Sequence, residues 1–371
     1  GNVGLYLLDT DFGANRAKDR AITNNLYGGD LTHRLKQEII LGIGGLKLLR
    51  MLGISPLVYH MNEGHSAFLV LARLVELVTQ YKLEYHEAME YIRQTSIFTT
   101  HTPVPAGHDQ FPEEVIKPYL QPFGEALKKD WSSLLSLGNT PQTTDNRNFS
   151  MTYLCLHGSN RVNGVSQVHG KISRRMFREF YPDFHEFEVP IKSITNGVHV
   201  PTWLAPEWQQ VFTKHIGVNW RKMLADKNFW KSALELDNKL VWQTHLAVKR
   251  RLIDWLRIHL EETFKQRRED PAHLAIALSN LDKDPLIMGF ARRFAPYKRA
   301  NLLFHNMARL EKLLSQGKPL IFLFSGKSHP SDGIGQALIR KVIEMSRQPQ
   351  FVGKILFVEN YDFEVAQLMV S

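Results

Sequence analysis

The chain has 371 residues, of which 43% are hydrophobic and 22% charged, a composition that excludes intrinsic disorder and fibrous structures. That length predicts two domains at roughly 150 residues each. The 46 Lys and Arg residues outnumber the 37 Asp and Glu residues, so the formal net charge is +9 and favours an anionic partner such as a phosphorylated small molecule. A solvated surface with a modest basic excess explains the same charge equally well.

Secreted, membrane-bound and nucleic-acid-binding proteins are not expected. The single cysteine, Cys155, cannot form an intrachain disulfide, which suits a reducing compartment such as the cytoplasm. No uninterrupted apolar run reaches about 18 residues, so no membrane partner is predicted. No long run of like charges and no zinc-finger or RNP-like pattern occurs, so nucleic acid is only a minor alternative.

Short β-like runs alternate with longer helical patterns along the chain. Strands are expected at 3–8, 56–59, 97–100, 192–194, 286–290, 320–324 and 354–358. The last three are nearly continuous apolar runs, which is typical of parallel strands buried on both faces. Helices are expected at 67–81 and 300–314, where apolar residues recur at steps of three and four. This alternation predicts an α/β fold with parallel sheets.

Two irregular stretches interrupt this pattern. The polar segment 138–150 is predicted to be a long surface loop, and the segment 196–206 contains two prolines, a glycine and a tryptophan. A mainly helical region follows as far as residue 270. We therefore place a domain boundary between residues 197 and 198, which gives domains of 1–197 and 198–371.

In the first half, polar side chains gather where predicted strands end, in the runs HMNEGH (60–65), TTHTP (99–103) and NGVH (196–199). The first run lacks the spacing of a zinc-protease motif, so a metal site is a weaker alternative there than a sugar site or a partner loop. A single histidine such as His101 is more often a satisfied core residue than a catalyst. Taken together, however, the runs supply the side chains that hold a carbohydrate.

In the second half, the run LIMGFARRFAPYKR (286–299) carries basic residues past a strand end. The strand is expected to end at Phe290, and Pro296 is expected to open the next helix. Arg293 and Lys298 then flank a helix amino terminus, where free N–H groups bind anions. We predict a phosphate or other oxyanion site here, with a solvated basic turn as the alternative.

Two glycine-containing turns further on do not complete a nucleotide-binding motif. GKS at 326–328 lacks the earlier glycine of a P-loop because Ile321 stands there, and GIG at 333–335 lacks a third glycine because Leu338 stands there. An ordinary strand–turn–helix connection and a ligand loop are equal alternatives. The two halves together predict a carbohydrate on one wall of a cleft and a phosphate on the other.

Six blocks of the chain carry a family resemblance: YHMNEGHSAF (59–68), FTTHTPVPAGHDQF (98–111), SNRVNGVSQVHG (159–170), ITNGVHVPTW (194–203), ARRFAPYKR (291–299) and KILFVENYD (354–362). In this order and spacing they resemble the α-glucan (glycogen/maltodextrin) phosphorylases. The variants NEGH and THTPVPAGHD resemble the shorter bacterial and archaeal branch of that family. The resemblance covers essentially the whole chain.

The resemblance implies a GT-B-like α/β fold, in which two Rossmann-like domains face each other across a cleft, both incomplete in this chain. Residues 1–197 would belong to the amino-terminal, glucan-side domain and residues 198–371 to the carboxyl-terminal domain that holds phosphate and cofactor. The implied activity is that of a glycosyltransferase: reversible phosphorolysis of an α-1,4-glucan that releases glucose 1-phosphate with retention of configuration.

The resemblance also implies roles for residues at matching positions. Three residues would be catalytic, the first two holding phosphate and the third the hydroxymethyl end of the glucosyl unit: Arg293, Lys298 and His101. Four further residues would bind or support the sugar: Asn196, Tyr297, Glu63 and His65. Three residues would lie near the cofactor: Arg292, Trp203 and Tyr361. No metal is implied.

The implied cofactor is pyridoxal 5′-phosphate, which such enzymes hold as a Schiff base on a lysine in a segment of the type EASGTSGMK. No such segment occurs in these 371 residues. The chain therefore resembles an internal fragment that we expect to be inactive alone, with the cofactor bound by its full-length parent. Ala295 stands where many animal-type members have histidine, and Pro296 replaces a glutamate, so the charge network of that branch is not transferable.

Two alternatives to a phosphorylase stay open. A nucleotide-sugar glucosyltransferase of the same architecture, similar to glycogen synthase, would place a pyrophosphate at the basic strand end. A glucan-binding fragment without catalysis is the non-enzymatic alternative.

Overall fold

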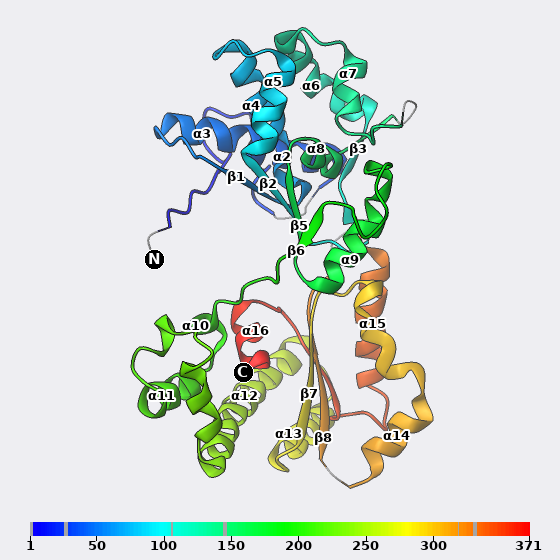
Figure 1. Cartoon of the computed structure of the whole chain (residues 1–371). Coiled ribbons are helices and arrows are strands. Elements are labelled where there is room, and N and C mark those ends of the chain that lie inside the picture. The colour runs from blue at the N-terminus through cyan, green and yellow to red at the C-terminus, as the bar shows by residue number, and fades with distance from the viewer. Residues whose placement is uncertain (1–2, 26–28, 105–106, 144–146, 318, 329–331) are drawn as a thin grey trace. The chain divides into compact units, whose positions relative to one another are not determined.

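The computed structural model describes residues 3–25, 29–104, 107–143, 147–317, 319–328 and 332–371. The chain forms two compact units, Gly1–Gly197 and Val198–Ser371 (Figure 1). Each unit combines helices with a parallel sheet, so the predicted α/β class with parallel sheets is confirmed. The functional roles expected of the two domains stay predictions.

The first unit contains a parallel sheet of order β1-β2-β5-β6, formed by β1 (Tyr59–Asn62), β2 (Ser96–Thr100), β5 (Arg161–Gly164) and β6 (Ile191–Ser193). An antiparallel pair is formed by β3 (Gln110–Pro112) and β4 (Asn148–Ser150). The α-helices are α1 (Ala17–Arg20), α2 (Leu31–Ile39), α3 (Gly45–Met51), α4 (Phe68–Thr79), α5 (Tyr85–Gln94), α6 (Glu113–Leu127), α7 (Trp131–Ser136), α8 (Met151–His157) and α9 (Gln167–Met176). The π-helical η1 (Ile40–Gly44) joins α2 to α3, and η2 (Gly64–Ser66) and η4 (Arg178–Phe180) are 3-10 turns.

Strand alternation decides which side of this sheet is buried. Met61 pairs with Phe98, and Phe98 with Val162, so the three side chains lie on one face. They join the buried core of the unit together with residues of α4 and α8. His60 and Asn62, one position out of phase, are exposed. β1 therefore alternates between buried and exposed residues, whereas most residues of β2 and β5 are buried.

The second unit contains a parallel sheet of order β7-β8-β9, formed by β7 (Leu286–Ala291), β8 (Leu320–Ser325) and β9 (Ile355–Val358). Its α-helices are α10 (Val200–Trp203), α11 (Pro206–His215), α12 (Asn238–Arg267), α13 (Pro271–Asp282), α14 (Met307–Ser315), α15 (Gly333–Ser346) and α16 (Phe363–Val370). Its 3-10 segments are η5 (Trp220–Lys222), η6 (Phe229–Glu235), η7 (Pro296–Lys298) and η8 (Ala300–His305).

The central strand β8 is buried on both faces. Ile321 and Leu323 pack into one core with α12 and α13, whereas Phe322 and Phe324 pack into another with α14 and α15. Figure 1 shows the two helix pairs on opposite sides of this sheet. This two-sided burial explains the continuous apolar run of β8.

Several expected elements are wrong or displaced. Residues 3–8 form no strand, and the first strand begins at Tyr59 rather than Pro56. β7, an edge strand of the described sheet, is not buried on both faces: Leu286 is 65% exposed and Met288 49%. The helix expected at 300–314 begins as the 3-10 segment η8, and α14 starts only after the side chain of Asn306 caps the amide of Arg309.

The segment 138–150 is only partly a surface loop. Asn139 and Thr140 are buried, and the segment ends in β4, which pairs with β3. A Cβ added to Gly138 would lie 2.4 Å from the Phe149 ring, so the start of the segment is packed closely on its end. No helix among the described residues is both long and apolar enough to span a membrane.

Candidate functional site

The predicted sugar-side residues of the first unit follow the carboxyl ends of its parallel strands. Glu63 follows β1, His101 follows β2 and Asn196 lies shortly after β6. All these strands run in the same direction, so their ends meet at one edge of the sheet, where ligands of open α/β sheets bind. Asn196 is exposed and His101 partly buried, and the backbone N–H of Asn196 donates to Val165 O at 3.0 Å.

Glu63 anchors the loop that carries His101. Glu63 is only 8% exposed, and its Oε1 accepts hydrogen bonds from the backbone N–H of His101 and, at 2.6 Å, from that of Thr102. Glu63 itself adopts φ 61° and ψ 179°, a region that is nearly restricted to glycine. That backbone costs on the order of 1–3 kcal/mol, so the two hydrogen bonds offset a local strain.

This anchor leads to a stability prediction. Glu63→Ala leaves two partly buried backbone amides without their acceptor, and we expect it to lower the free energy of unfolding by roughly 1.5–3 kcal/mol. Glu63→Gln keeps one amide oxygen and should cost about half as much. Denaturant unfolding of the polypeptide expressed from its complete reading frame measures both values. The exposed neighbour change Asn62→Ala is the control, and equal losses for Ala and Gln would contradict the anchoring role.

His108 supports the same carboxylate and was not singled out by the sequence. Its Nδ1 lies 2.9 Å from Thr152 Oγ1 and 4.0 Å from Glu63 Oε2. Burial lowers the pKa of His108, which favours the neutral ring. The only sequence signal was its place in the same block as His101.

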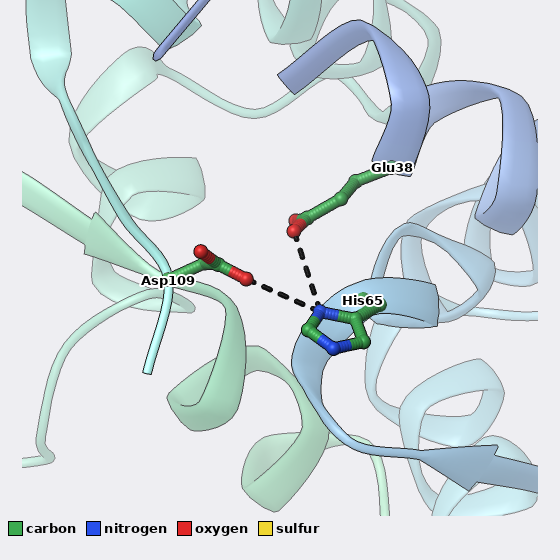
Figure 2. A group of neighbouring side chains, drawn as sticks. All are labelled: Glu38, His65 and Asp109. Atoms are coloured by element: carbon green, nitrogen blue, oxygen red, sulfur yellow. Dashed lines mark hydrogen bonds and ion pairs between the residues drawn. The ribbon is translucent and has the colours of Figure 1, made fainter. Parts of the chain in front are cut away.

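His65 belongs to an ionic cluster that the sequence did not reveal. Nδ1 of His65 lies 3.2 Å from Asp109 Oδ2 and 3.6 Å from Glu38 Oε1 (Figure 2). Arg34 contacts all three groups: its Nη2 lies 2.5 Å from His65 Nδ1 and 3.0 Å from Asp109 Oδ2, and its Nε lies 3.1 Å from Glu38 Oε1. We name Arg34, Glu38, His65 and Asp109 the α2 cluster.

Burial and the neighbouring charges shift the pKa values of the α2 cluster. Burial raises the pKa of Glu38 to about 8. The pKa of His65 rises to about 9, because hydrogen bonds to Asp109 and Glu38 outweigh the opposing effect of burial. Burial tends to raise the pKa of Asp109. Hydrogen bonds with His65, Glu38 and Arg34 outweigh this effect and hold the pKa of its carboxyl well below its usual range.

The α2 cluster has the donor set of a metal site but already contains a cation. The ligand atoms of Glu38, His65 and Asp109 all lie within 4.8 Å of one another, which suits a divalent ion. The Arg34 guanidinium is in contact with each of these three groups. A metal ion would therefore have to displace it.

In the second unit, the predicted phosphate residues lie on the loop that follows β7. Arg292 and Arg293 are exposed directly after the strand. Lys298 is partly buried, and its Nζ lies 4.6 Å from the ring centroid of Tyr297. The loop thus presents four cations, Arg299 included, and one phenol at the carboxyl edge of the sheet.

The helix amino terminus expected at Pro296 is wrong. Pro296–Lys298 form a three-residue 3-10 turn, and Arg299 then takes the left-handed region at φ 57°. That residue breaks the helical path, and the chain resumes as the 3-10 segment η8. Any anion held here is therefore bound by side chains and not by the dipole of an α-helix.

Backbone contacts fix this loop against the end of β8. The N–H of Arg292 donates to Ser325 O at 3.2 Å, and the N–H of Phe294 donates to Lys327 O at 2.9 Å. Gly326, between these acceptors, has φ 152°, and a Cβ there would lie 1.9 Å from Arg292 O. The glycine of the incomplete P-loop motif therefore allows a close backbone approach.

The residues expected near the cofactor lie around the same sheet. Arg292 follows β7 and Tyr361 follows β9, so both are at its carboxyl edge. The ring of Trp203 lies 5.0 Å from that of Phe363, at the start of α16. Trp203 and Phe363 also line a pocket of about 570 Å³ together with Trp255, whereas Arg292 and Tyr361 do not line it.

A sequence model described as Carbohydrate phosphorylase matches residues 54–371. The chain belongs to the carbohydrate phosphorylase family. The resemblance found in its strand-end blocks is thereby confirmed, and the mixed α/β fold with parallel sheets is that expected of this family.

Curated members of the phosphorylase family match the whole chain. It is 41% identical over 372 residues to maltodextrin phosphorylase of Thermococcus litoralis, covering 43% of that protein. It is 38% identical over 381 residues to glycogen phosphorylase of Mycobacterium bovis and 34% identical over 371 residues to glycogen phosphorylase of Aquifex aeolicus, covering 44% and 53% of them. The chain thus spans about half the length of the curated relatives it matches.

Proposed function

We propose that the polypeptide carrying this chain is an α-1,4-glucan phosphorylase, a glycosyltransferase that uses inorganic phosphate to release glucose 1-phosphate with retention. The observation that carries the proposal is the 41% identity to maltodextrin phosphorylase over the full chain. The two sheet edges support it, because one presents polar side chains of the kind that bind sugars and the other presents cations. Glucan, inorganic phosphate and glucose 1-phosphate are the proposed partners.

On the glucan side, His101 and Asn196 hold the hydroxymethyl end of the glucosyl unit. Both follow strands of one sheet, and the imidazole of His101 makes no hydrogen bond to any described residue, so its ring nitrogens are available to a ligand. Glu63 acts through the backbone of His101 and Thr102. His65 supports the same edge from the turn after β1.

On the phosphate side, Arg293 and Lys298 bind the substrate phosphate, and Tyr297 contacts the sugar beside it. A second phosphate nearby would repel the first by about 4 kcal/mol for each pair of unit charges at 4 Å in an effective dielectric of 20. One charge-assisted contact contributes roughly 1.5–3 kcal/mol. Several cations on one loop are therefore needed, and the loop after β7 supplies them.

The proposed cofactor is pyridoxal 5′-phosphate, which would lie against Arg292, Trp203 and Tyr361. A guanidinium, an indole and a phenol around one sheet fit a phosphorylated aromatic ring, and Trp203 already packs against an aromatic neighbour. When bound, the cofactor supplies a phosphate group that can exchange a proton. Arg292 would neutralise charge there, and Trp203 would exclude water.

We propose a cytoplasmic location as well. Cys155 is a free thiol and fully buried, where burial raises its pKa well above the usual value. A buried protonated thiol is inert, and a free cysteine suits a reducing compartment.

The sugar-side assignment is tested by substrate discrimination. His101→Ala and Asn196→Ala should each lose about 1–3 kcal/mol of preference for a glucosyl unit bearing the 6-hydroxyl over its 6-deoxy analogue, because a hydrogen bond is lost. Glucose 1-phosphate release from the two substrates measures this preference. His86→Ala, an exposed histidine on α5, is the matched control. Undiminished discrimination would assign both residues a structural role, and glucosyl transfer from a nucleotide sugar without phosphorolysis would overturn the function.

A further inference from the structure

The α2 cluster joins three segments that are distant in the sequence. Arg34 and Glu38 come from helix α2, His65 from the turn η2 after β1, and Asp109 from the residues before β3. Figure 2 shows the three titratable side chains converging from these segments. Asp109 belongs to the block that starts at β2 and includes His101, and His65 lies two positions after Glu63.

The contacts make α2 the support of both loops. Glu38 is 1% exposed, and among the described residues its carboxylate meets Arg34 and His65 by ion pairs. Arg34 then connects Glu38 to Asp109, because its Nε contacts the first carboxylate and its Nη2 the second. A buried carboxylate is costly unless charge balances it, so the cluster holds together only as a set.

We propose that Arg34 and Glu38 are positioning residues of the glucan-side edge, which hold His65 and Asp109 and thereby fix the loops after β1 and before β3. This inference rests on the proposed function, because it deepens the assignment of that edge. Arg34 and Glu38 touch no reacting atom in this role. They act through His65 and Asp109.

The charges of the α2 cluster balance with one added proton. Two carboxylates and one guanidinium leave a single negative charge, which a proton on His65 or Glu38 neutralises. Nδ1 of His65 either accepts from Arg34 or, when protonated, donates to Asp109, so the position of this proton selects between two contacts. Further groups face the cluster, namely His108 near Asp109 and Cys155 near Glu38.

The sign of the pH dependence follows from this balance. The folded cluster binds the proton more tightly than the unfolded chain, because the pKa values of Glu38 and His65 are raised to about 8 and about 9. The part of this stabilisation that comes from His65 is complete below its ordinary pKa of about 6.5 and is lost as the pH rises to about 9. The part that comes from Glu38 is complete only below its ordinary pKa of about 4.5 and is lost as the pH rises to about 8. Alkaline pH should loosen both loops.

Glu38→Gln tests the positioning role, with Glu76→Gln as the matched control. Glu76 forms an ion pair of 2.6 Å with Arg50, which also binds the hydroxyl of Tyr59 at the start of β1, the opposite edge of the sheet. Both variants are made in the polypeptide expressed from its complete reading frame. Amide hydrogen exchange of peptides covering 63–67 and 107–112 is measured from pH 6 to 10, together with the pH profile of phosphorolysis.

In Glu38→Gln we expect faster amide exchange in both peptides and a raised KM for glucan. The alkaline limb of the pH profile of phosphorolysis should shift to lower pH by roughly one unit, because His65 loses a neighbouring carboxylate. Glu76→Gln should leave all three unchanged. Arg34→Lys keeps the positive charge but loses the planar guanidinium with its paired donors. Its exchange rates, KM for glucan and alkaline limb should therefore lie between those of wild type and those of Arg34→Met. This series also covers the case in which Glu38→Gln fails to fold.

Unchanged exchange and an unchanged pH profile in Glu38→Gln would overturn the positioning role. So would a response of the wild-type protein to EDTA or added Zn²⁺ that Glu38→Gln abolishes, because the cluster would then be a metal site. Absence of phosphorolysis in the wild type would overturn the proposed function instead, and the exchange measurement would still decide the positioning role.

Discussion

Replacing Arg293 with alanine is expected to raise the KM for phosphate and to lower kcat at the same time. The guanidinium is exposed at the carboxyl edge of the second sheet, on a loop that is held by backbone hydrogen bonds. Its charge acts on the phosphate in the ground state and in the transition state. Losing a charge-assisted contact of roughly 1.5–3 kcal/mol corresponds to a fall in kcat/KM of about tenfold to 150-fold.

Steady-state kinetics with varied phosphate at saturating glucan measure this effect. Arg309→Ala is the matched control, since Arg309 is an exposed arginine on α14 of the same unit. Its removal changes the net charge equally and should leave the phosphate KM unaltered. If Arg293→Ala behaves like the control, the loop after β7 is a solvated basic turn and the phosphate assignment is wrong.

Gly326→Ala is expected to disrupt the second unit strongly. The new Cβ would lie 1.9 Å from Arg292 O, and φ 152° is a conformation that alanine rarely adopts. The loop after β7 must move away from β8, breaking the hydrogen bonds to Ser325 and Lys327. Overpacking of this kind costs about 1–3 kcal/mol, and the strained backbone adds a similar amount.

Denaturant unfolding and the phosphate KM together check this result. Gly333→Ala is the control, because a Cβ at Gly333, the first residue of α15, meets nothing within 4 Å. It should be neutral or slightly stabilising. A Gly326→Ala protein with wild-type stability and phosphate KM would show that neither folding nor phosphate binding depends on the close backbone approach at this glycine.

The sequence predicted the strands best where burial was strongest. The runs of β8 and β9 were recognised because two cores surround β8, which leaves only apolar side chains on it. The expected strand at 3–8 shows the limit of this reasoning, since an apolar run becomes a strand only when a neighbour pairs with it. The 3-10 geometry at Pro296–Lys298 was missed because the left-handed Arg299 carries no local signal.

The strand-end positions of Glu63, His101 and Asn196 could be predicted, because the motifs sit directly after β-like runs and parallel strands end at a common edge. The partners of these residues could not. Neither Arg34 nor Glu38 belongs to a motif, and Asp109 lies 44 positions from His65, yet the four form one cluster.

The amino-acid sequence alone thus determined the α/β class, the polar and basic strand ends and the family, since these depend on local periodicity and on motifs within short segments. Only the tertiary structure decided which carboxylate anchors the His101 loop, which glycine admits the Arg292 loop and which charges balance His65. Those features depend on contacts between segments far apart in the chain. Packing sets such contacts within a few ångströms, and no spacing along the sequence encodes them.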